Sequence, residues 1–320
     1  MTSPSLFSNT FVLADCFQPG ADAVLYPGDC LRLLKQIPDR SIQLVVTSPP
    51  YNIGKEYEKK RQLQDYIQFQ EQVIRECVRV LSDTGSICWE VGNYVDNGSI
   101  IPLDIALYPV FNSLGLVMRN RIIWSFEHGL HCSNRFSGRY ETILWFTRNT
   151  NKYVFNLDPV RVPQKYPGKK YFKGPKAGQY SCNPLGKNPG DVWDIPNVKN
   201  NHVEKTDHPC QFPVELIERL VLSMSNAADW VLDPFVGAGT SIIAAIRHGR
   251  RGAGAETEPK YVDIAKGRIQ AAFDGTLKVR PMNKPKYEPV AGNKLTNSPW
   301  LPAKEFQPLS LKPEVTSEDR

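Results

Sequence analysis

The fold of this chain is decided by residues 41–51, SIQLVVTSPPY. Residues 42–46 are a short, mostly apolar run that is rich in β-branched side chains, which predicts a buried strand of a parallel sheet. The two prolines end this strand, because each holds the residue before it in an extended conformation. Ligands bind beyond the carboxyl ends of such strands in open α/β sheets. We therefore expect a stiff, ligand-facing loop at Thr47, Ser48, Pro49, Pro50 and Tyr51, although a plain proline-rich turn has the same pattern.

A second stretch, residues 229–241 (DWVLDPFVGAGTS), predicts a strand, a glycine turn and a helix. Asp233 ends the strand, and the two glycines let the backbone turn tightly and approach a ligand. The hydroxyls of Thr240 and Ser241 are expected to cap the helix that follows.

Two further acidic residues end short predicted strands. Residues 252–255 lead to Glu256, whose carboxylate is placed to accept hydrogen bonds from ribose hydroxyls, as in nucleotide-binding βαβ units. Residues 23–28 lead to Asp29, which precedes helical spacing over residues 30–37 and can therefore serve as a helix N-cap. A glycine turn followed by a strand with an acidic end favours a nucleotide-like ligand.

Together, these stretches resemble the amino-methylating DNA methyltransferases of bacterial restriction–modification systems. In that family SPPY is the catalytic loop and DPFxGxGT is the S-adenosylmethionine loop. The catalytic block comes first here, which is the permuted order of the family's β group. The resemblance covers residues 24–270. It implies an α/β, Rossmann-like, S-adenosylmethionine-dependent methyltransferase fold with circularly permuted motif order and an inserted target-recognition region.

The resemblance also assigns roles to individual residues. The catalytic loop consists of Ser48, Pro49, Pro50 and Tyr51. Residues 208–213, HPCQFP, resemble the family block His-Pro-x-Gln-x-Pro that lines the cofactor site, although many relatives have lysine in place of Phe212. The family's Gly-Asp pair, here ending at Asp29, borders the adenine pocket. The implied S-adenosyl-L-methionine site consists of Asp29, Thr47, His208, Gln211, Asp233, Pro234, Phe235, Gly237, Gly239, Thr240 and Glu256.

The Pro-Cys-Gln triplet around Cys210 also resembles the nucleophile of the cytosine-C5 methyltransferases. We reject that interpretation for two reasons. Cys210 fits the His-Pro-x-Gln-x-Pro block on both sides, and C5 chemistry does not use an SPPY loop.

The predicted elements divide the chain into five parts. These are an N-terminal arm (1–23), the catalytic part of the methyltransferase domain (24–147), a target-recognition insertion (148–205), the cofactor-binding part (206–275) and a tail (276–320). Helical spacing is found over residues 65–81, 102–114 and 214–224. Strand patterns are found over 86–92, 119–124 and 141–146, the last two as an antiparallel pair. The polar stretch 52–64 is expected to be mobile in the absence of DNA.

The insertion combines basic residues, spread from Arg148 to Lys205, with interleaved aromatic residues and little helical periodicity. A long irregular segment within a compact domain is usually functional or disordered, and aromatic residues argue against simple disorder. Lysines neutralise phosphates, while aromatic rings and amides can reach bases. A solvated basic loop is the alternative. The predicted DNA contacts are Lys165, Lys169, Lys170, Tyr171, Lys173 and Lys176.

Composition narrows the class of protein. The chain has 320 residues, a net charge of +6 and 41% hydrophobic residues, which is ordinary for a globular protein with a polyanionic partner. Its seven cysteines are scattered and odd in number, which argues against a disulfide framework and a zinc site. No apolar run suits a membrane span, and no signal peptide is evident. We expect a cytoplasmic, nucleoid-associated prokaryotic protein, monomeric or homodimeric, with no metal.

The chemistry needs nucleophile placement and charge stabilisation, because the methyl group of a sulfonium is already electrophilic. Acceptors at Ser48 and the Pro49 carbonyl would draw the exocyclic amino nitrogen of a base towards tetrahedral geometry. Tyr51 would stack on the ring. Since that amino group lies inside the duplex, the base must be flipped out.

The expected activity is site-specific methylation of cytosine N4 in duplex DNA. In this family a leading Ser, as at Ser48, is more typical of N4-cytosine enzymes and a leading Asp of N6-adenine enzymes, and adenine N6 is the alternative. The expected partners are double-stranded DNA and a cognate restriction endonuclease. Two other classes stay open: a catalytically silent DNA-binding module, and a methyltransferase that acts on RNA, protein or a small molecule.

Overall fold

The computed structural model describes residues 11–52, 62–127, 129, 131–199 and 201–287. The chain divides into two compact units, residues 1–284 and 285–320, and the fold described below is that of the first unit. The predicted mobile stretch lies mostly at residues 53–61, outside the described residues. None of the described helices is both long and apolar enough to cross a membrane.

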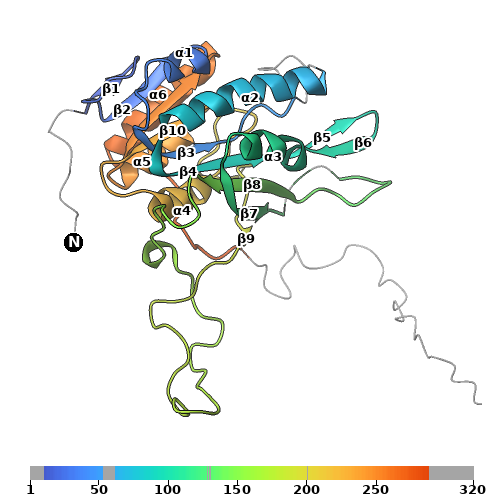
Figure 1. Cartoon of the computed structure of the whole chain (residues 1–320), viewed down its shortest axis with the longest axis vertical. Coiled ribbons are helices and arrows are strands. Elements are labelled where there is room, and N and C mark those ends of the chain that lie inside the picture. The colour runs from blue at the N-terminus through green and yellow to red at the C-terminus, as the bar shows by residue number, and fades with distance from the viewer. Residues whose placement is uncertain (1–10, 53–61, 128, 130, 200, 288–320) are drawn as a thin grey trace, which may run out of the picture. The chain divides into compact units, whose positions relative to one another are not determined.

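A nine-stranded sheet forms the centre of the first unit (Figure 1). In spatial order its strands are β1 (Leu13–Ala14), β2 (Ala23–Pro27), β11 (Arg251–Glu256), β10 (Trp230–Asp233), β3 (Ile42–Thr47), β4 (Leu81–Val91), β8 (Tyr140–Thr147), β7 (Val117–Ser125) and β9 (Val192–Asp194). Neighbours from β1 to β4 run parallel, whereas β8 is antiparallel to both β4 and β7. The predicted α/β methyltransferase fold and the predicted antiparallel pair are confirmed.

The neighbouring positions of β3 and β10 matter most for function. These strands lie far apart in the sequence, yet Leu44 pairs with Val231 and Val45 with Leu232 in parallel register. Both strands therefore end at the same edge of the sheet. The two motif loops that follow them are brought together by this single pairing.

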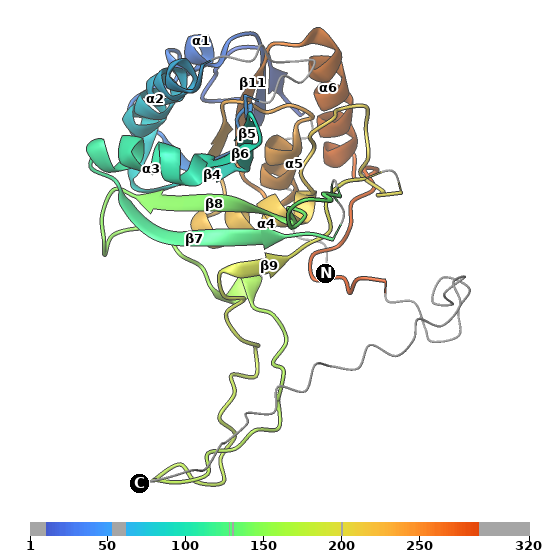
Figure 2. The same cartoon turned by 90° about the vertical axis from the view of Figure 1, so that its right-hand side faces the viewer.

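Helices cover both faces of the sheet, and Figure 2 shows α2 and α6 on opposite sides of it. One face packs against α1 (Cys30–Leu34), α2 (Leu63–Val80) and α3 (Leu103–Ser113). The other face packs against α4 (Val214–Met224), α5 (Thr240–Arg247) and α6 (Pro259–Phe273). Side chains of β3 alternate between the two cores from Leu44 onward: Val45 faces the first, and Leu44 and Val46 face the second. Ile42 also packs in the first core, because the pairing with β4 is irregular between Ile42 and Leu44.

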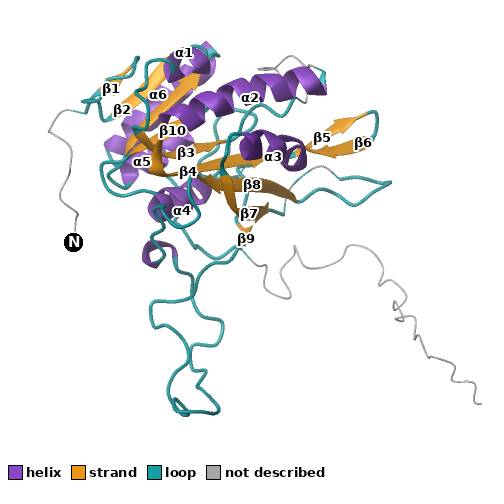
Figure 3. Ribbon diagram, viewed as in Figure 1, coloured by secondary structure: helices purple, strands orange, loops and turns teal. Residues whose placement is uncertain are grey.

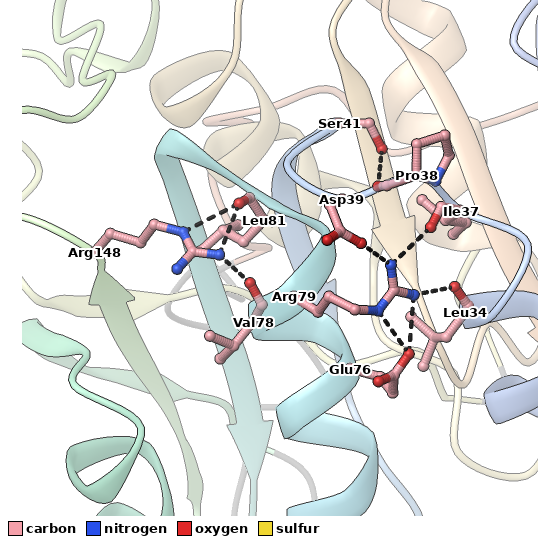
Figure 4. Close-up of polar contacts among 10 residues, drawn as sticks. All are labelled: Leu34, Ile37, Pro38, Asp39, Ser41, Glu76, Val78, Arg79, Leu81 and Arg148. Carbon is pink, nitrogen blue, oxygen red and sulfur yellow. Dashed lines mark hydrogen bonds and ion pairs between the residues drawn. The ribbon is translucent and has the colours of Figure 1, made fainter.

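Two arginines hold the C-terminal end of α2 in place (Figure 4). Arg79 donates to the carbonyl oxygens of Leu34 (2.7 Å) and Ile37 (3.0 Å), which ties α2 to the end of α1. Arg148 donates to the carbonyl of Val78 in the last turn of α2 and to that of Leu81, the C-cap residue. Arg148 is thus used for a structural contact, although the sequence placed it among the basic residues of the recognition insertion.

The predicted insertion is only partly an exposed arm. Residues 148–160 pack on the core through contacts such as Asn156 N–H to the Ser223 carbonyl (2.7 Å), and Val160 is buried. Further along, β9 joins the sheet beside β7 and buries Trp193. Residues 161–191 extend away from the sheet, as the teal segment below the strands in Figure 3 shows. Only this shorter segment has the exposure that the whole insertion was expected to have.

The ends of the described chain are more tightly packed than the sequence indicated. Within the predicted loose arm, residues 13–14 form β1, and the Phe11 ring stacks on Phe273 with centroids 4.4 Å apart. At the other end, Arg280 lies in the predicted tail, yet its backbone N–H donates to Glu204 (2.9 Å) and its guanidinium pairs with Glu215. Residues 1–10 and 288–320 lie outside the described residues.

A short two-stranded sheet was not predicted. It consists of β5 (Asn93–Asp96) and β6 (Ser99–Pro102), joined at Asn97-Gly98. Both turn residues have positive φ, 47° and 83°, which matches the mirror-image turn that Asn-Gly favours.

Candidate active site

The SPPY loop leaves the carboxyl end of β3 and carries a hydrogen-bonded cluster. The Tyr51 hydroxyl donates to Oε2 of Glu90 at 2.6 Å and lies 3.0 Å from Oγ of Ser48. Because the Tyr51 hydroxyl donates its proton to Glu90, the Ser48 hydroxyl is a donor within this cluster. The lone pairs of Ser48 Oγ remain available to accept hydrogen bonds from a ligand. Burial, followed by the charges of Glu141 and Glu90, raises the pKa of Tyr51 well above its usual value. Tyr51 therefore stays a neutral hydrogen-bond donor.

Asp233 joins the catalytic loop to the glycine turn. Its Oδ1 accepts from the Thr47 hydroxyl at 2.5 Å and from the backbone N–H of Phe235 at 3.0 Å, and its Oδ2 accepts from the Ser241 hydroxyl. Burial raises the pKa of Asp233 to about 6, although these three donors favour the charged form. The prediction that Thr240 and Ser241 cap α5 is wrong: Gly239 is the N-cap, in left-handed conformation, and Ser241 turns towards Asp233.

The glycine turn is shaped so that side chains are excluded from it. Gly237 has φ 51°, and a Cβ there would lie 3.0 Å from Nε2 of His208. Gly239 has φ 81°, and a Cβ there would lie 3.1 Å from the Cβ of Ala265. A side chain at either glycine would therefore crowd its neighbours, and the turn at the start of α5 exposes backbone without side chains to the cavity; we call this turn the glycine cradle.

His208 closes one side of this cradle as a neutral imidazole. Burial, and then the charge of Lys205, lowers the pKa of His208 to about 4. Its Nδ1 accepts from the backbone N–H of Cys210 at 3.3 Å, so Nε2 carries the ring proton beside the glycine turn. The ring packs edge-on against Tyr261, with centroids 4.4 Å apart.

The two predicted acidic residues lie at the ends of β2 and β11. Asp29 accepts hydrogen bonds from the backbone N–H groups of Leu31 (3.0 Å) and Arg32 (3.3 Å), so its interpretation as the N-cap of α1 is confirmed. Asp29 also lines the cavity described below. Glu256 accepts from the backbone N–H of Glu258 at 2.8 Å, and burial raises its pKa. Both carboxyl groups are therefore held in place by backbone donors.

A cavity of about 440 Å³ unites most of the predicted site. The predicted residues that line it are Asp29, Ser48, Pro49, Pro50, Tyr51, His208, Gln211, Pro234, Phe235, Gly237, Thr240 and Glu256. Thr47, Asp233 and Gly239 are not among its lining residues. Thr47 and Asp233 hold the two loops from behind, and Gly239 lets α5 begin close to α6.

The predicted cofactor residues fit S-adenosyl-L-methionine. The glycine cradle admits a ligand close to the backbone, and the carboxyl groups of Asp29 and Glu256 supply acceptors to amino and hydroxyl groups. Aromatic side chains, Phe69 and Phe235 among them, line the cavity beside these polar groups, with ring centroids 6.2 Å apart. A nucleoside-sized ligand with an amino-bearing heterocycle matches this set of groups.

Sequence reasoning missed several residues of the cavity wall, of which Glu90 and Glu141 are the most important. Glu90 lies near the carboxyl end of the predicted strand 86–92, so the rule that ligands bind at that edge could have found it. Glu141 is the second residue of β8, which runs in the opposite direction, so its place beside the end of β4 becomes visible only once that pairing is known. The other unpredicted lining residues include Tyr66, Phe69, Gln70, Trp124, Phe126, Asn197, Lys199 and Tyr261.

The predicted DNA contacts lie on the exposed arm and do not line the cavity. Lysine ammonium groups of the arm lie over aromatic rings: Lys165 over Tyr166 (5.5 Å to the centroid), Lys170 over Tyr180 (5.1 Å) and Lys176 over Tyr171 (6.0 Å). The Lys173 ammonium likewise lies 5.9 Å from the ring of Phe172, whose side chain is 90% exposed. Lys169 is also exposed. The arm thus presents cations and aromatic faces to solvent together.

Residues 42–267 match the model of a protein family described as DNA methylase. The Type II methyltransferase M.BglII of Bacillus subtilis is 54% identical over 242 residues, which cover 75% of this chain and 67% of that protein. The DNA adenine methyltransferase YhdJ of Escherichia coli (strain K12) is 34% identical over 255 residues, which cover 77% of this chain and 82% of that protein.

Solved structures of two similar proteins share the fold. The putative DNA modification methylase TTHA0409 of Thermus thermophilus, complexed with S-adenosyl-L-methionine, aligns with a TM-score of 0.56 and 29% identity, over 78% of this chain and 94% of that one. The PvuII DNA methyltransferase (cytosine-N4-specific) aligns with a TM-score of 0.62 and 20% identity, over 80% and 93% respectively.

Proposed function

We propose that this chain, which belongs to the DNA methylase family, transfers a methyl group from S-adenosyl-L-methionine to an exocyclic amino nitrogen of a base in duplex DNA. One observation carries the proposal. The SPPY loop after β3 and the glycine turn after β10 face the same cavity, and the hydrogen bond from Thr47 to Asp233 joins them. A nucleophile held by the first loop would therefore meet a methyl donor held by the second.

S-adenosyl-L-methionine, when bound, supplies an electrophilic methyl group on a sulfonium. The chain's own residues would hold it: Glu256 through ribose hydroxyls, Asp29 through the adenine amino group, and the glycine turn through close backbone approach. His208, neutral and buried, presents Nε2–H beside that turn.

Ser48 and Pro49 would act on the nucleophile. The amino group of a base is a poor nucleophile because its lone pair is delocalised into the ring. Hydrogen bonds to Oγ of Ser48 and to the Pro49 carbonyl would favour a tetrahedral nitrogen and stabilise the positive charge that develops on it. As the nitrogen–carbon bond forms, the carbon–sulfur bond breaks and its electron pair stays on sulfur. The nitrogen then releases one proton to water and becomes neutral.

Cytosine N4 is the favoured target, because the loop begins with Ser48 and a leading Ser is more typical of N4-cytosine enzymes in the family that the sequence resembles. Adenine N6 is the second candidate. The name DNA adenine methyltransferase of the 34% identical relative supports it.

Mass spectrometry of nucleosides from DNA treated with the enzyme and isotope-labelled S-adenosyl-L-methionine tests both candidates. We expect labelled N4-methylcytosine. Labelled N6-methyladenine would select the second candidate. The absence of label from both nucleosides, with label in RNA treated in parallel, would contradict DNA as the substrate.

DNA binding is assigned to the arm, residues 161–191, where exposed lysines and aromatic rings lie together. Lysines would contact phosphates, while aromatic rings would support the strand from which the base is flipped. We further propose that the chain is the modification half of a restriction–modification system with a cognate endonuclease, since M.BglII is a Type II methyltransferase. Plasmid DNA methylated by the chain should resist at least one endonuclease in a panel of differing specificities.

A further inference from the structure

Two carboxyl groups that no motif accounts for lie beside the SPPY loop. Glu90 is near the end of β4 and Glu141 is near the start of β8, and these strands pair antiparallel. The Cγ of Glu141 lies 3.6 Å from where a Cβ of Gly92 would be, so Glu141 is next to the end of β4. Both glutamates line the cavity together with Tyr51.

Glu90 is incompletely paired. Its side chain is buried, with 3% of its surface exposed, and its Oε2 accepts from the Tyr51 hydroxyl. Its Oε1 has no hydrogen-bond partner among the residues that the structure describes. Burying a carboxylate oxygen without a hydrogen-bond donor costs free energy. An unpaired oxygen on a cavity wall therefore indicates either a donor that the ligand brings or a proton shared with a neighbouring carboxyl group.

The surroundings favour one proton for the two carboxyl groups. Burial raises the pKa of Glu90, and burial together with the charge of Glu90 raises the pKa of Glu141 well above its usual value. The other groups that face Glu141 are Lys199, which favours its ionised form, and the Cys210 thiol. A hydrogen bond with Glu141, followed by those with Ser48 and Tyr51, favours the ionised form of Glu90, and the bond between the two carboxyl groups raises the pKa of Glu141. Two buried carboxyl groups that share a hydrogen bond do not both ionise.

We infer that Glu141 carries the proton of this pair and, once the flipped base has entered the cavity, donates it in a hydrogen bond to the ring nitrogen next to the amino group of that base, while Glu90 remains the carboxylate. The inference rests on the proposed function. Cytosine N3 and adenine N1 are acceptors that adjoin an amino group. Thymine and guanine present an N–H donor at the corresponding ring position. A neutral Glu141 would therefore favour cytosine and adenine over thymine and guanine through the ring nitrogen. The SPPY loop contacts only the amino group of the base.

The test uses the target base mapped by nucleoside mass spectrometry and a duplex that contains it. In a second duplex, the ring nitrogen is replaced by C–H, as in 3-deazacytosine or 1-deazaadenine. The wild-type single-turnover rate should fall about 10- to 100-fold on the deaza duplex, the range expected for one buried hydrogen bond. On the natural duplex, the single-turnover rate of Glu141→Ala should be lower than that of the wild type by a similar factor. On the deaza duplex, the rate of Glu141→Ala should be little lower than its own rate on the natural duplex. Additive losses would overturn the inference.

The pH profile gives a second, independent readout. The donor exists below the raised pKa of Glu141 and is lost as pH rises through it, so the wild-type rate should fall on the alkaline side. Glu141→Gln keeps an N–H donor that does not titrate, so its alkaline fall should disappear. An identical alkaline fall in the wild type and Glu141→Gln would contradict the inference.

Two controls separate the possible failures. Glu71→Gln, an exposed glutamate on α2 paired with Arg75, should keep the wild-type rates and pH profile. Calorimetric affinity for S-adenosyl-L-methionine should stay unchanged in the Glu141 variants, which shows that they are folded. If the wild type transfers no methyl group to DNA, the proposed function fails. If it does, and the deaza penalty persists in Glu141→Ala, only this inference fails.

Discussion

The hydroxyl of Thr47 donates a 2.5 Å hydrogen bond to Oδ1 of Asp233, across a separation of 186 residues in the sequence. Both side chains are completely buried. The bond joins the last residue of β3 to the last residue of β10, and therefore sets the distance between the SPPY loop and the glycine turn. The sequence predicted direct cofactor contacts for Thr47 and Asp233, whereas their side chains lie behind the cavity wall.

Thr47→Val should destabilise the protein, because it leaves the buried Asp233 carboxylate without one of its three donors. The expected loss is about 1–3 kcal/mol in the free energy of unfolding. Thr47→Ser is the matched control, since it keeps the hydroxyl and should lose less. Urea unfolding monitored by circular dichroism measures both. Equal stability of Thr47→Val and the wild type would show that this bond contributes nothing to the fold.

Gly237→Ala should weaken S-adenosyl-L-methionine binding. The residue has φ 51°, and the added Cβ would lie 3.0 Å from Nε2 of His208. A strained left-handed residue costs about 1–2 kcal/mol, which corresponds to roughly tenfold in affinity if the turn shifts to relieve it. Gly267→Ala on α6 has open space around its Cβ and serves as the control. If calorimetry finds the same S-adenosyl-L-methionine affinity in both variants, the turn at Gly237 does not contribute to cofactor binding.

Tyr51→Ala should lower the rate of methyl transfer more than the affinity for DNA. It removes a stacking surface worth roughly 1–3 kcal/mol per base on known platforms, and it also disturbs the position of the amino group. Tyr51→Phe keeps the ring, loses the hydroxyl's hydrogen bonds with Glu90 and Ser48, and should retain an intermediate rate. Single-turnover kinetics beside DNA titrations distinguish these effects. Full rates in Tyr51→Ala and in Ser48→Ala would mean that the loop is only a turn.

Simultaneous replacement of Lys169, Lys170 and Lys173 by Ala should weaken DNA binding and flatten its salt dependence by roughly one unit of slope per lost phosphate contact. Three lysines outside the arm, Lys35, Lys266 and Lys278, form the control set. DNA titrations between low and moderate salt measure the slopes. The alternative of a solvated loop predicts the same slope for both triple variants.

Cys210→Ser should retain substantial methyl transfer. The thiol lines the cavity and is exposed, so its position alone does not exclude a chemical role. A cytosine-C5 mechanism needs a thiolate that attacks the ring, whereas amino methylation needs none. A folded Cys210→Ser protein that binds cofactor and DNA but transfers no methyl group would reverse our interpretation of the HPCQFP block.

The local features of this fold were predictable from sequence. The helix predicted over residues 214–224 matches α4, and the antiparallel pair 119–124 and 141–146 lies within β7 and β8. Such elements follow from periodicity and from prolines and glycines that act on their immediate neighbours. The β5–β6 hairpin carries the same kind of local signal in Asn97-Gly98.

The tertiary structure alone decided which distant groups meet and which ionise. The pairing of β3 with β10 brings Thr47 to Asp233, and the reversed direction of β8 brings Glu141 to Glu90. It also turned the hydroxyl of Ser241, a predicted helix cap, towards Asp233, and it placed Arg148, one of the basic residues of the predicted insertion, against the end of α2. Sequence patterns report the neighbours of a residue along the chain. Burial and charge depend on neighbours in space, and these set the protonation of the Glu90–Glu141 pair.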